Sequence, residues 1–214
     1  MKRLFDFILL NFLWIIFSIP IITTGASTCA AYYVTLKLVD SKENPDGFAL
    51  LDVIKLFLKG FKQNFKQGTI LWAFTAPCIY ASYLLWKLVL SADDLNIFFI
   101  IGAAIYTLIE AVFIIFSYPI VARYYTNLKT AVRNSFGTAL LYLKSTVLIF
   151  ILVALETAFF IWNKYTMLSA IVIGPELIIF TVSYVLKKVF VNIEKMNEQK
   201  ENAEKAEATD NAGD

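Results

Sequence analysis

The sequence predicts an all-α fold, a polytopic transmembrane helix bundle with about five spans. Of its 214 residues, 59% are hydrophobic and only 17% are charged, whereas soluble domains hold about 45–50% apolar residues. The mean hydropathy is +0.67. The charges are also segregated, because long stretches carry none and most of the 19 Lys and Arg residues lie between those stretches. A soluble fold of this size could not bury so much apolar surface, so we expect the chain to lie in a membrane.

The first expected span covers residues 5–22 and follows Met-Lys-Arg. Asp6 interrupts this apolar run, and the run is longer than the ~7–15 residues of a signal-peptide core. We therefore expect the segment to be mature structure.

Residues 18–33, SIPIITTGASTCAAYY, interrupt the large apolar side chains with a proline and small residues. Pro20 predicts a kink at the end of the span, because proline lacks the N–H that a helix needs. Small residues let membrane helices approach closely, so Gly25, Ala26 and Ser27 predict tight helix packing. A broken helix that lines a substrate site is the alternative.

Residues 48–67 predict a basic amphipathic helix at the membrane surface. Four lysines recur at spacings of four, three and four, which places them on one helical face. Ile54, Phe57, Phe61 and Phe65 form another face. The lysines could simply anchor the helix among anionic headgroups, or they could dock a partner's cytoplasmic domain. This face comprises Lys55, Lys59, Lys62 and Lys66.

Four further spans follow, each an apolar stretch of about the length that crosses a bilayer. The third of them is short, so we expect it to begin nearer residue 140. A last segment, 191–214, is rich in charge, Ala and Asn. It predicts a helix extension that frays into a disordered, acidic cytoplasmic tail after an integral membrane domain at 1–190. The four spans cover residues 69–90, 97–121, 146–161 and 167–189.

A weak two-span internal repeat relates residues 5–90 to residues 97–161. Ser-x-Pro-Ile, Tyr-Tyr, Leu-Lys, Asn, Phe and Gly-Thr recur in the same order, and Pro119 matches Pro20. A repeat of two spans preserves orientation, so the first span should run like the third.

Lys and Arg concentrate after the first and third spans and after the last, which predicts that these segments and the C-terminus are cytoplasmic. The side of the N-terminus stays open. If residues 25–39 fold back as a short sixth segment, Lys2 and Arg3 also lie inside. The repeat instead favours five spans with the N-terminus outside.

Three glutamates, Glu110, Glu156 and Glu176, fall inside expected spans, where ionisable groups are costly and therefore candidates for function. No Lys or Arg lies at a comparable depth. The carboxyls must be protonated, hydrogen-bonded to polar side chains of other helices, or exposed in a wet cavity. Pro175 precedes Glu176 and frees the carbonyl of residue 171, which makes this a candidate cation or polyol site. Protonated packing contacts are the simpler interpretation.

Two quoted segments, WIIFSIPIITTGASTCAAYYVTLKLVD (14–40) and FLKGFKQNFKQGTILW (57–72), resemble the YesL-like family of small bacterial integral membrane proteins of unknown function. The resemblance extends over about residues 5–190. It implies a location in the bacterial plasma membrane and an association with carbohydrate uptake systems. It implies no catalytic residue.

The residue content argues against an enzyme. Histidine is absent, Cys29 and Cys78 lie far apart, and no metal-ligand cluster or phosphate-binding glycine loop is present. We expect no cofactor, no metal and no nucleic-acid partner. Two functions stay open: a non-catalytic accessory or regulatory partner of carbohydrate transporter subunits, or a small transporter or channel with its glutamates at a midplane site. A homo-oligomer would supply enough wall for such a carrier.

Overall fold

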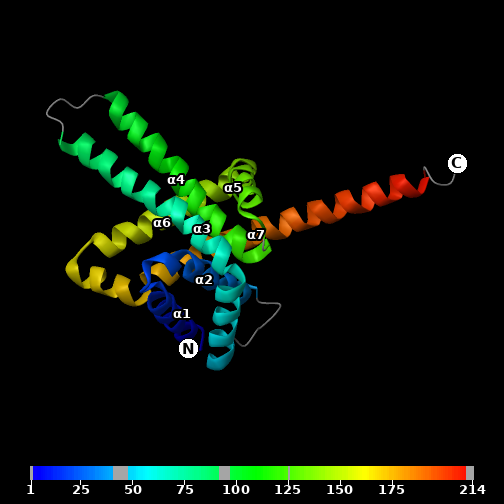
Figure 1. The fold of residues 1–214 in the computed structure, drawn as a ribbon, viewed down its shortest axis with the longest axis horizontal. Coiled ribbons are helices and arrows are strands. Elements are labelled where there is room, and N and C mark those ends of the chain that lie inside the picture. Colours follow the sequence, from blue (N-terminus) through cyan, green and yellow to red (C-terminus); the bar gives the residue numbers. More distant parts are fainter. Residues whose placement is uncertain (1, 41–47, 92–96, 125, 211–214) are drawn as a thin grey trace.

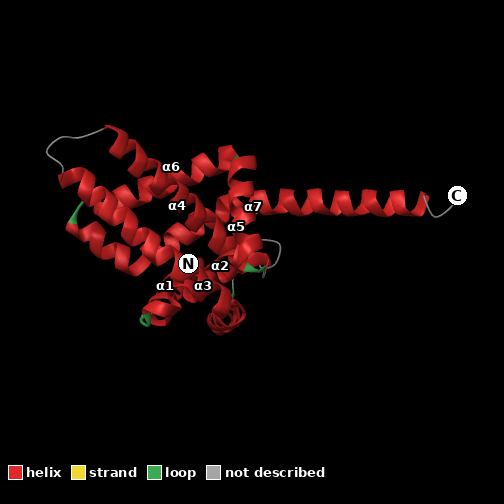
Figure 2. Ribbon diagram, turned by 45° about the horizontal axis from the view of Figure 1, so that its top comes forward, coloured by secondary structure: helices red, strands yellow, loops and turns green. Residues whose placement is uncertain are grey.

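The described part of the chain is entirely helical outside its short connections (Figures 1 and 2). The computed structural model describes residues 2–40, 48–91, 97–124 and 126–210. This confirms the predicted all-α class. The helices, in chain order, are α1 (Lys2–Ser18), the 3₁₀ helix η1 (Ile21–Thr23), α2 (Thr24–Val39), α3 (Leu50–Ser91), α4 (Ile97–Tyr124), α5 (Leu128–Leu141), α6 (Leu143–Ile161) and α7 (Lys164–Asp210).

Four of the helices, α3, α4, α6 and α7, are long and apolar enough to cross a membrane, and α1 is a shorter apolar helix. The first expected span, 5–22, was too long at its C-terminal end. The α1 helix stops at Ser18 because Pro20 lacks the amide hydrogen that would continue it. Its 17 residues measure about 25 Å, less than the ~30 Å hydrocarbon core.

The chain folds back after α1, so α1 and α2 form an antiparallel helical hairpin. The hydroxyl of Thr23 closes the turn by donating to the carbonyl of Phe17 at 2.6 Å. Further along, the indole of Trp14 donates to Thr28 at 3.0 Å, and Ser27 donates to the carbonyl of Trp14 at 3.0 Å. The segment left open as a sixth piece is therefore a separate helix, α2, and not a continuation of α1.

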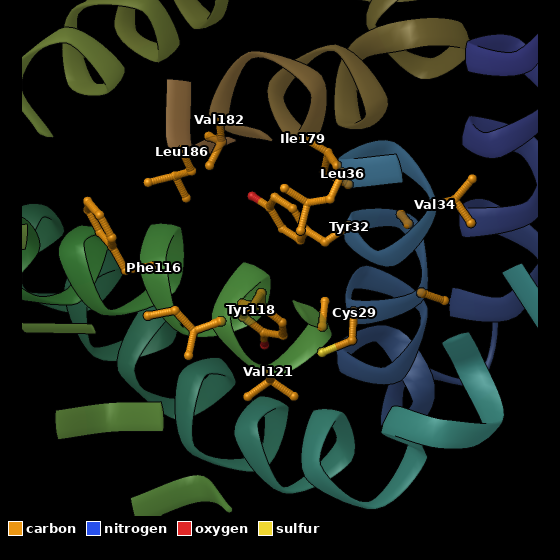
Figure 3. Packing of buried hydrophobic residues seen from close by; sticks show 14 of the residues in the cluster. Cys29, Tyr32, Val34, Leu36, Phe116, Tyr118, Val121, Ile179, Val182 and Leu186 are labelled. Carbon is orange, nitrogen blue, oxygen red and sulfur yellow. The ribbon is translucent and has the colours of Figure 1, made fainter. Parts of the chain in front are cut away.

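The α2 helix lies at the centre of the bundle and contacts α1, α3, α4 and α7. Its N-terminal half consists of small residues, so four neighbours can approach it closely. Figure 3 shows Tyr32 and Leu36 of α2 packed among Tyr118 of α4 and Ile179 of α7. The hydrophobic core therefore surrounds a helix of only 16 residues.

The expected surface helix and second span are one continuous helix, α3, of 42 residues. No residue between them ends the helix, although it holds Gly68 and Pro77. The register against α2 places Gly60 beside Tyr33 and Gly68 beside Gly25. The two helices are therefore antiparallel, and α3 continues well beyond the N-terminal end of α2.

Four of the helices form two pairs, α3 with α4 and α6 with α7. The pairs extend from the α2 region at an angle to each other (Figure 1). Both pairs expose large apolar side chains along their outer faces. Such a surface is suited to lipid and not to water. The fourth span begins at Leu143, between the two starting points expected for it.

The α7 helix has 47 residues and extends far from the bundle toward the C-terminus (Figure 1). Residues 191–210 are helical, so the helix extension expected after the last span takes up most of the segment in which the sequence predicted a disordered tail; residues 211–214 lie outside the described part. Glu, Lys, Ala and Gln are strong helix formers, and Lys205 pairs with Glu201 one turn earlier at 2.7 Å. Helix propensity and this ion pair therefore both favour continuation of the helix beyond the bundle.

The two copies of the proposed repeat differ in local structure. Pro20 precedes a turn, whereas Pro119 lies inside α4, which continues to Tyr124. The kink expected at Pro20 is thus replaced by a chain reversal. The repeat itself stays a prediction.

Candidate functional site

Each of the three intramembrane glutamates accepts a hydrogen bond from a hydroxyl on a neighbouring helix. Glu110 of α4 accepts one from Ser82 of α3. Glu156 of α6 accepts one from Thr181 of α7. These bonds link the two helices of each pair, because an apolar environment leaves a carboxyl few other partners.

Glu176 is the most buried of the three, with 1% of its surface exposed. The hydroxyl of Thr35 in α2 donates to its Oε1 at 2.5 Å. The backbone N–H of Glu176 lies 3.3 Å from Oδ1 of Asn11, which accepts from it. The carboxyl therefore sits where α1, α2 and α7 meet.

Asn11 also completes the helix at Pro175. The proline cannot donate to the carbonyl of Ile171, four residues earlier. The amide nitrogen of Asn11 donates to that carbonyl at 2.9 Å. One buried side chain from α1 thus pairs with the carbonyl that the proline leaves without a donor and with the N–H of the residue after the proline, a role that sequence reasoning did not assign to it.

The structure does not bring the glutamates together. Glu110 lies between α3 and α4, Glu156 between α6 and α7, and Glu176 against α1 and α2. The second carboxyl oxygen of each is buried without a hydrogen-bond partner among the described residues. Neither of the two cavities described below is lined by any of them. Within the described ranges, no three His, Cys, Asp or Glu side chains cluster as metal ligands would.

The lysine face of α3 is fully formed. All four of its members, Lys55, Lys59, Lys62 and Lys66, are exposed. The opposite face packs inward, with Phe57 buried and Phe61 half-buried. The ring of Phe17 in α1 lies 5.4 Å from that of Phe57 and 4.9 Å from that of Phe61, between centroids. Of the three phenylalanines that the sequence placed on the second face of this helix, only Phe65 is exposed.

The small residues after Pro20 are used inside the chain. Gly25, Ala26 and Ser27 are buried, and a Cβ added at Gly25 would overlap the carbonyl oxygen of Gly68. The surface that these small residues form is therefore packed against α3 within the chain.

A charged cluster joins the ends of α2, α4 and α7. Arg123 forms two hydrogen bonds to the carboxylate of Glu194, at 2.8 and 3.1 Å. Lys187 lies 3.3 Å from the carboxylate of Asp40 and donates to the carbonyl of Val39 at 3.0 Å. A cavity of about 290 Å³ lies beside these groups. Two bridges, each between helices distant in sequence, thus fix the same end of the bundle.

Sequence reasoning missed this cluster. Its only sequence signal is a basic residue directly after a span and an acidic residue just beyond the last span, a pattern that many surface charges share. Glu194 lies outside the apolar part of α7. The hydrogen bond from Arg123 and its positive charge lower the pKa of Glu194, although partial burial opposes this.

Comparison with known proteins bears on the N-terminal part of the chain. Residues 7–86 match the model of a family described as "Protein of unknown function, DUF624". The matched residues include both segments that resemble the YesL-like family, and the match is consistent with that resemblance. It spans α1, α2 and most of α3, less than the 5–190 expected.

Searches of the curated proteins and of the solved structures returned no match. The four long apolar helices indicate an integral, multi-pass membrane protein, and the family whose model residues 7–86 match is one of unknown function.

Proposed function

We propose that this protein is a non-catalytic accessory or regulatory component of the bacterial plasma membrane that docks on a carbohydrate uptake system through the lysine face of α3. The observation that carries the proposal is the exposure of all four lysines on one side of α3 while the other side is anchored in the bundle. The carbohydrate link comes from the family resemblance alone.

Anchoring makes this face suitable for recognition. Phe57 and Phe61 pack against Phe17 of α1, and Gly60 lies against Tyr33 of α2. Because the backbone of α3 is held along its length, the lysines keep a fixed spacing. A fixed row of positive charge favours a partner with a complementary acidic surface and speeds their encounter.

The alternative, a small transporter with a glutamate site, has less support. Glu110 and Glu176 lie in different helix contacts, and each carboxyl is tied to one hydroxyl. A carrier that uses both would have to bring them to a shared cavity.

Co-purification in mild detergent tests the proposal. Tagged membrane-spanning subunits of a carbohydrate uptake system are co-expressed with the wild-type chain or with a variant carrying K55Q, K59Q, K62Q and K66Q. We expect the wild type to be retained and the variant to be lost. The matched control changes four exposed lysines elsewhere, K129Q, K144Q, K188Q and K195Q, and should be retained.

Carbohydrate uptake in cells that lack the protein gives a second measurement. Wild type should restore uptake, and the lysine variant should not. If E110Q and E176Q abolish uptake while the lysine variant restores it fully, the accessory role is wrong and the carrier is favoured. Equal retention of both lysine variants in the co-purification would also contradict the proposed docking face.

A further inference from the structure

A second, larger cavity of about 620 Å³ forms a groove between α5 and the part of α7 just beyond its apolar stretch. Ile120 and Tyr124, from the C-terminal part of α4, also line it. α5 packs against α4 and, at its C-terminal end, against α6. No sequence feature had indicated this groove, and the lysine face of α3 contributes nothing to its lining.

Two helical stripes face the groove. From α7 they are Ile193, Met196, Asn197 and Lys200, at spacings of three, one and three, which place them on one side of the helix. The acidic residues of the same segment, Glu194, Glu198 and Glu201, fall on another side. From α5 the stripe consists of Arg133, Asn134, Gly137, Thr138 and Leu141.

The groove has apolar lining residues, and its charged lining residues in the described chain are both cations, Arg133 of α5 and Lys200 of α7. Phe190 and Ile120, both buried, lie where the apolar parts of α7 and α4 end. Lys200 lies ten residues farther along α7, about 15 Å from Phe190 along the helix axis. Arg133 and Lys200 are exposed, and no carboxyl lines the groove along the described chain. The nearby Glu194 is bound by Arg123 instead.

We propose that this groove binds an anionic phospholipid of the adjacent leaflet, with its headgroup phosphate between Arg133 and Lys200. The two cations suit a phosphodiester, because arginine and lysine pair readily with phosphate oxygens. The apolar lining includes Leu141, which is exposed, and suits the start of an acyl chain. Basic pockets at the ends of transmembrane helices are a known way to hold acidic headgroups.

Charge separates this occupant from others. A zwitterionic headgroup would bring a second cation toward Arg133 and Lys200, with no groove carboxyl to receive it. The polar side chains of Asn134 and Asn197, which also line the groove, supply hydrogen-bonding groups for a glycerol or similar headgroup. An amphipathic segment of another protein is the competing occupant, and the test below treats it as a contrary outcome.

Native mass spectrometry of the full-length chain in detergent tests the proposal, with phosphatidylglycerol and phosphatidylcholine of identical acyl chains as probes. We expect the wild type to retain one phosphatidylglycerol at least about tenfold more tightly than phosphatidylcholine. The R133Q/K200Q variant should lose that preference. Both residues are exposed, so the variant should fold like the wild type. Equal midpoints of thermal unfolding in the same detergent check this.

The matched control is K188Q/K195Q, which removes the same charge from other sides of α7 and should keep the wild-type preference. The charge-conserving R133K/K200R variant should keep it as well. Soluble glycerol phosphate should not displace the lipid, because it lacks the acyl chains. The proposal is overturned if both lipids bind wild type equally, if R133Q/K200Q retains the preference, or if glycerol phosphate or an added acidic amphipathic peptide displaces the lipid completely.

Discussion

The side-chain amide of Asn11 donates to the carbonyl of Ile171, the acceptor that Pro175 leaves without its helical donor. Asn11 is completely buried, and its amide oxygen accepts from the N–H of Glu176. A contact between the first and last helices thus repairs a break in the last one. The contact therefore contributes more to the stability of the bundle when the proline is present.

The dependence of Asn11 on Pro175 can be measured in a double-mutant cycle. Asn11→Leu leaves the Ile171 carbonyl unpaired in an apolar part of the protein, so we expect the free energy of unfolding to fall by about 1–3 kcal/mol. In a Pro175→Ala background the new N–H can pair with that carbonyl, and the same change should cost less. Unfolding in mixed micelles by sodium dodecyl sulfate measures all four variants. Strictly additive effects would contradict the pairing.

The close approach of α2 and α3 makes a second prediction. A Cβ at Gly25 would overlap the Gly68 carbonyl oxygen, and one at Gly68 would lie 2.8 Å from the backbone of Ala26. Gly25→Ala should therefore lower the free energy of unfolding by about 1–3 kcal/mol. Gly102 has open space around its Cβ position, so Gly102→Ala is the control and should stabilise by up to about 1 kcal/mol. Equal effects at both sites would rule out the tight contact.

The α1–α2 hairpin predicts the side of the N-terminus. The end of α2 is tied to Lys187 through Asp40 and Val39, and α1 runs antiparallel to α2, so α1 begins at the end of the bundle where α7 leaves it. Reporters fused to the two termini should both lie inside the cell: fluorescent protein should glow and alkaline phosphatase should be inactive. Opposite results at the two termini would restore the five-span arrangement.

The Arg123–Glu194 pair predicts a dependence of stability on pH. Its partner lowers the pKa of folded Glu194 below the ~4.3 of an unfolded glutamate. The pair therefore contributes fully above the unfolded pKa and loses its contribution as the pH falls through the folded pKa. Wild type should be more stable than Glu194→Gln at pH 7, and the difference should shrink steadily below pH 4. A constant difference from pH 7 to pH 3 would show that the charge of Glu194 does not matter.

The helical class and the approximate spans were predictable, because the length of each apolar stretch can be read directly from consecutive residues. The ends of the helices were less predictable. Pro20 signalled an interruption, yet whether it kinks a span or reverses the chain depends on packing between α2 and four other helices. That packing is set by contacts such as Gly25 with Gly68, which no local pattern reveals.

The candidate sites divide in the same way. Burial cost alone marked Glu110, Glu156 and Glu176, but their hydroxyl partners lie 25 to 141 residues away in sequence. Periodicity marked the lysine face directly. The groove between α5 and α7 was not predictable, because its two stripes become one surface only after α4 and α7 are placed.

Because α7 is one continuous helix, motion of its apolar part is transmitted to its charged C-terminal part. Its apolar half and its charged end share one axis, so any tilt of the part inside the bilayer moves the part outside. Residues 191–210 extend about 30 Å, so a tilt of about 10° displaces the far end by about 5 Å. A change in bilayer thickness that tilts the apolar part of α7 would therefore displace residues 191–210.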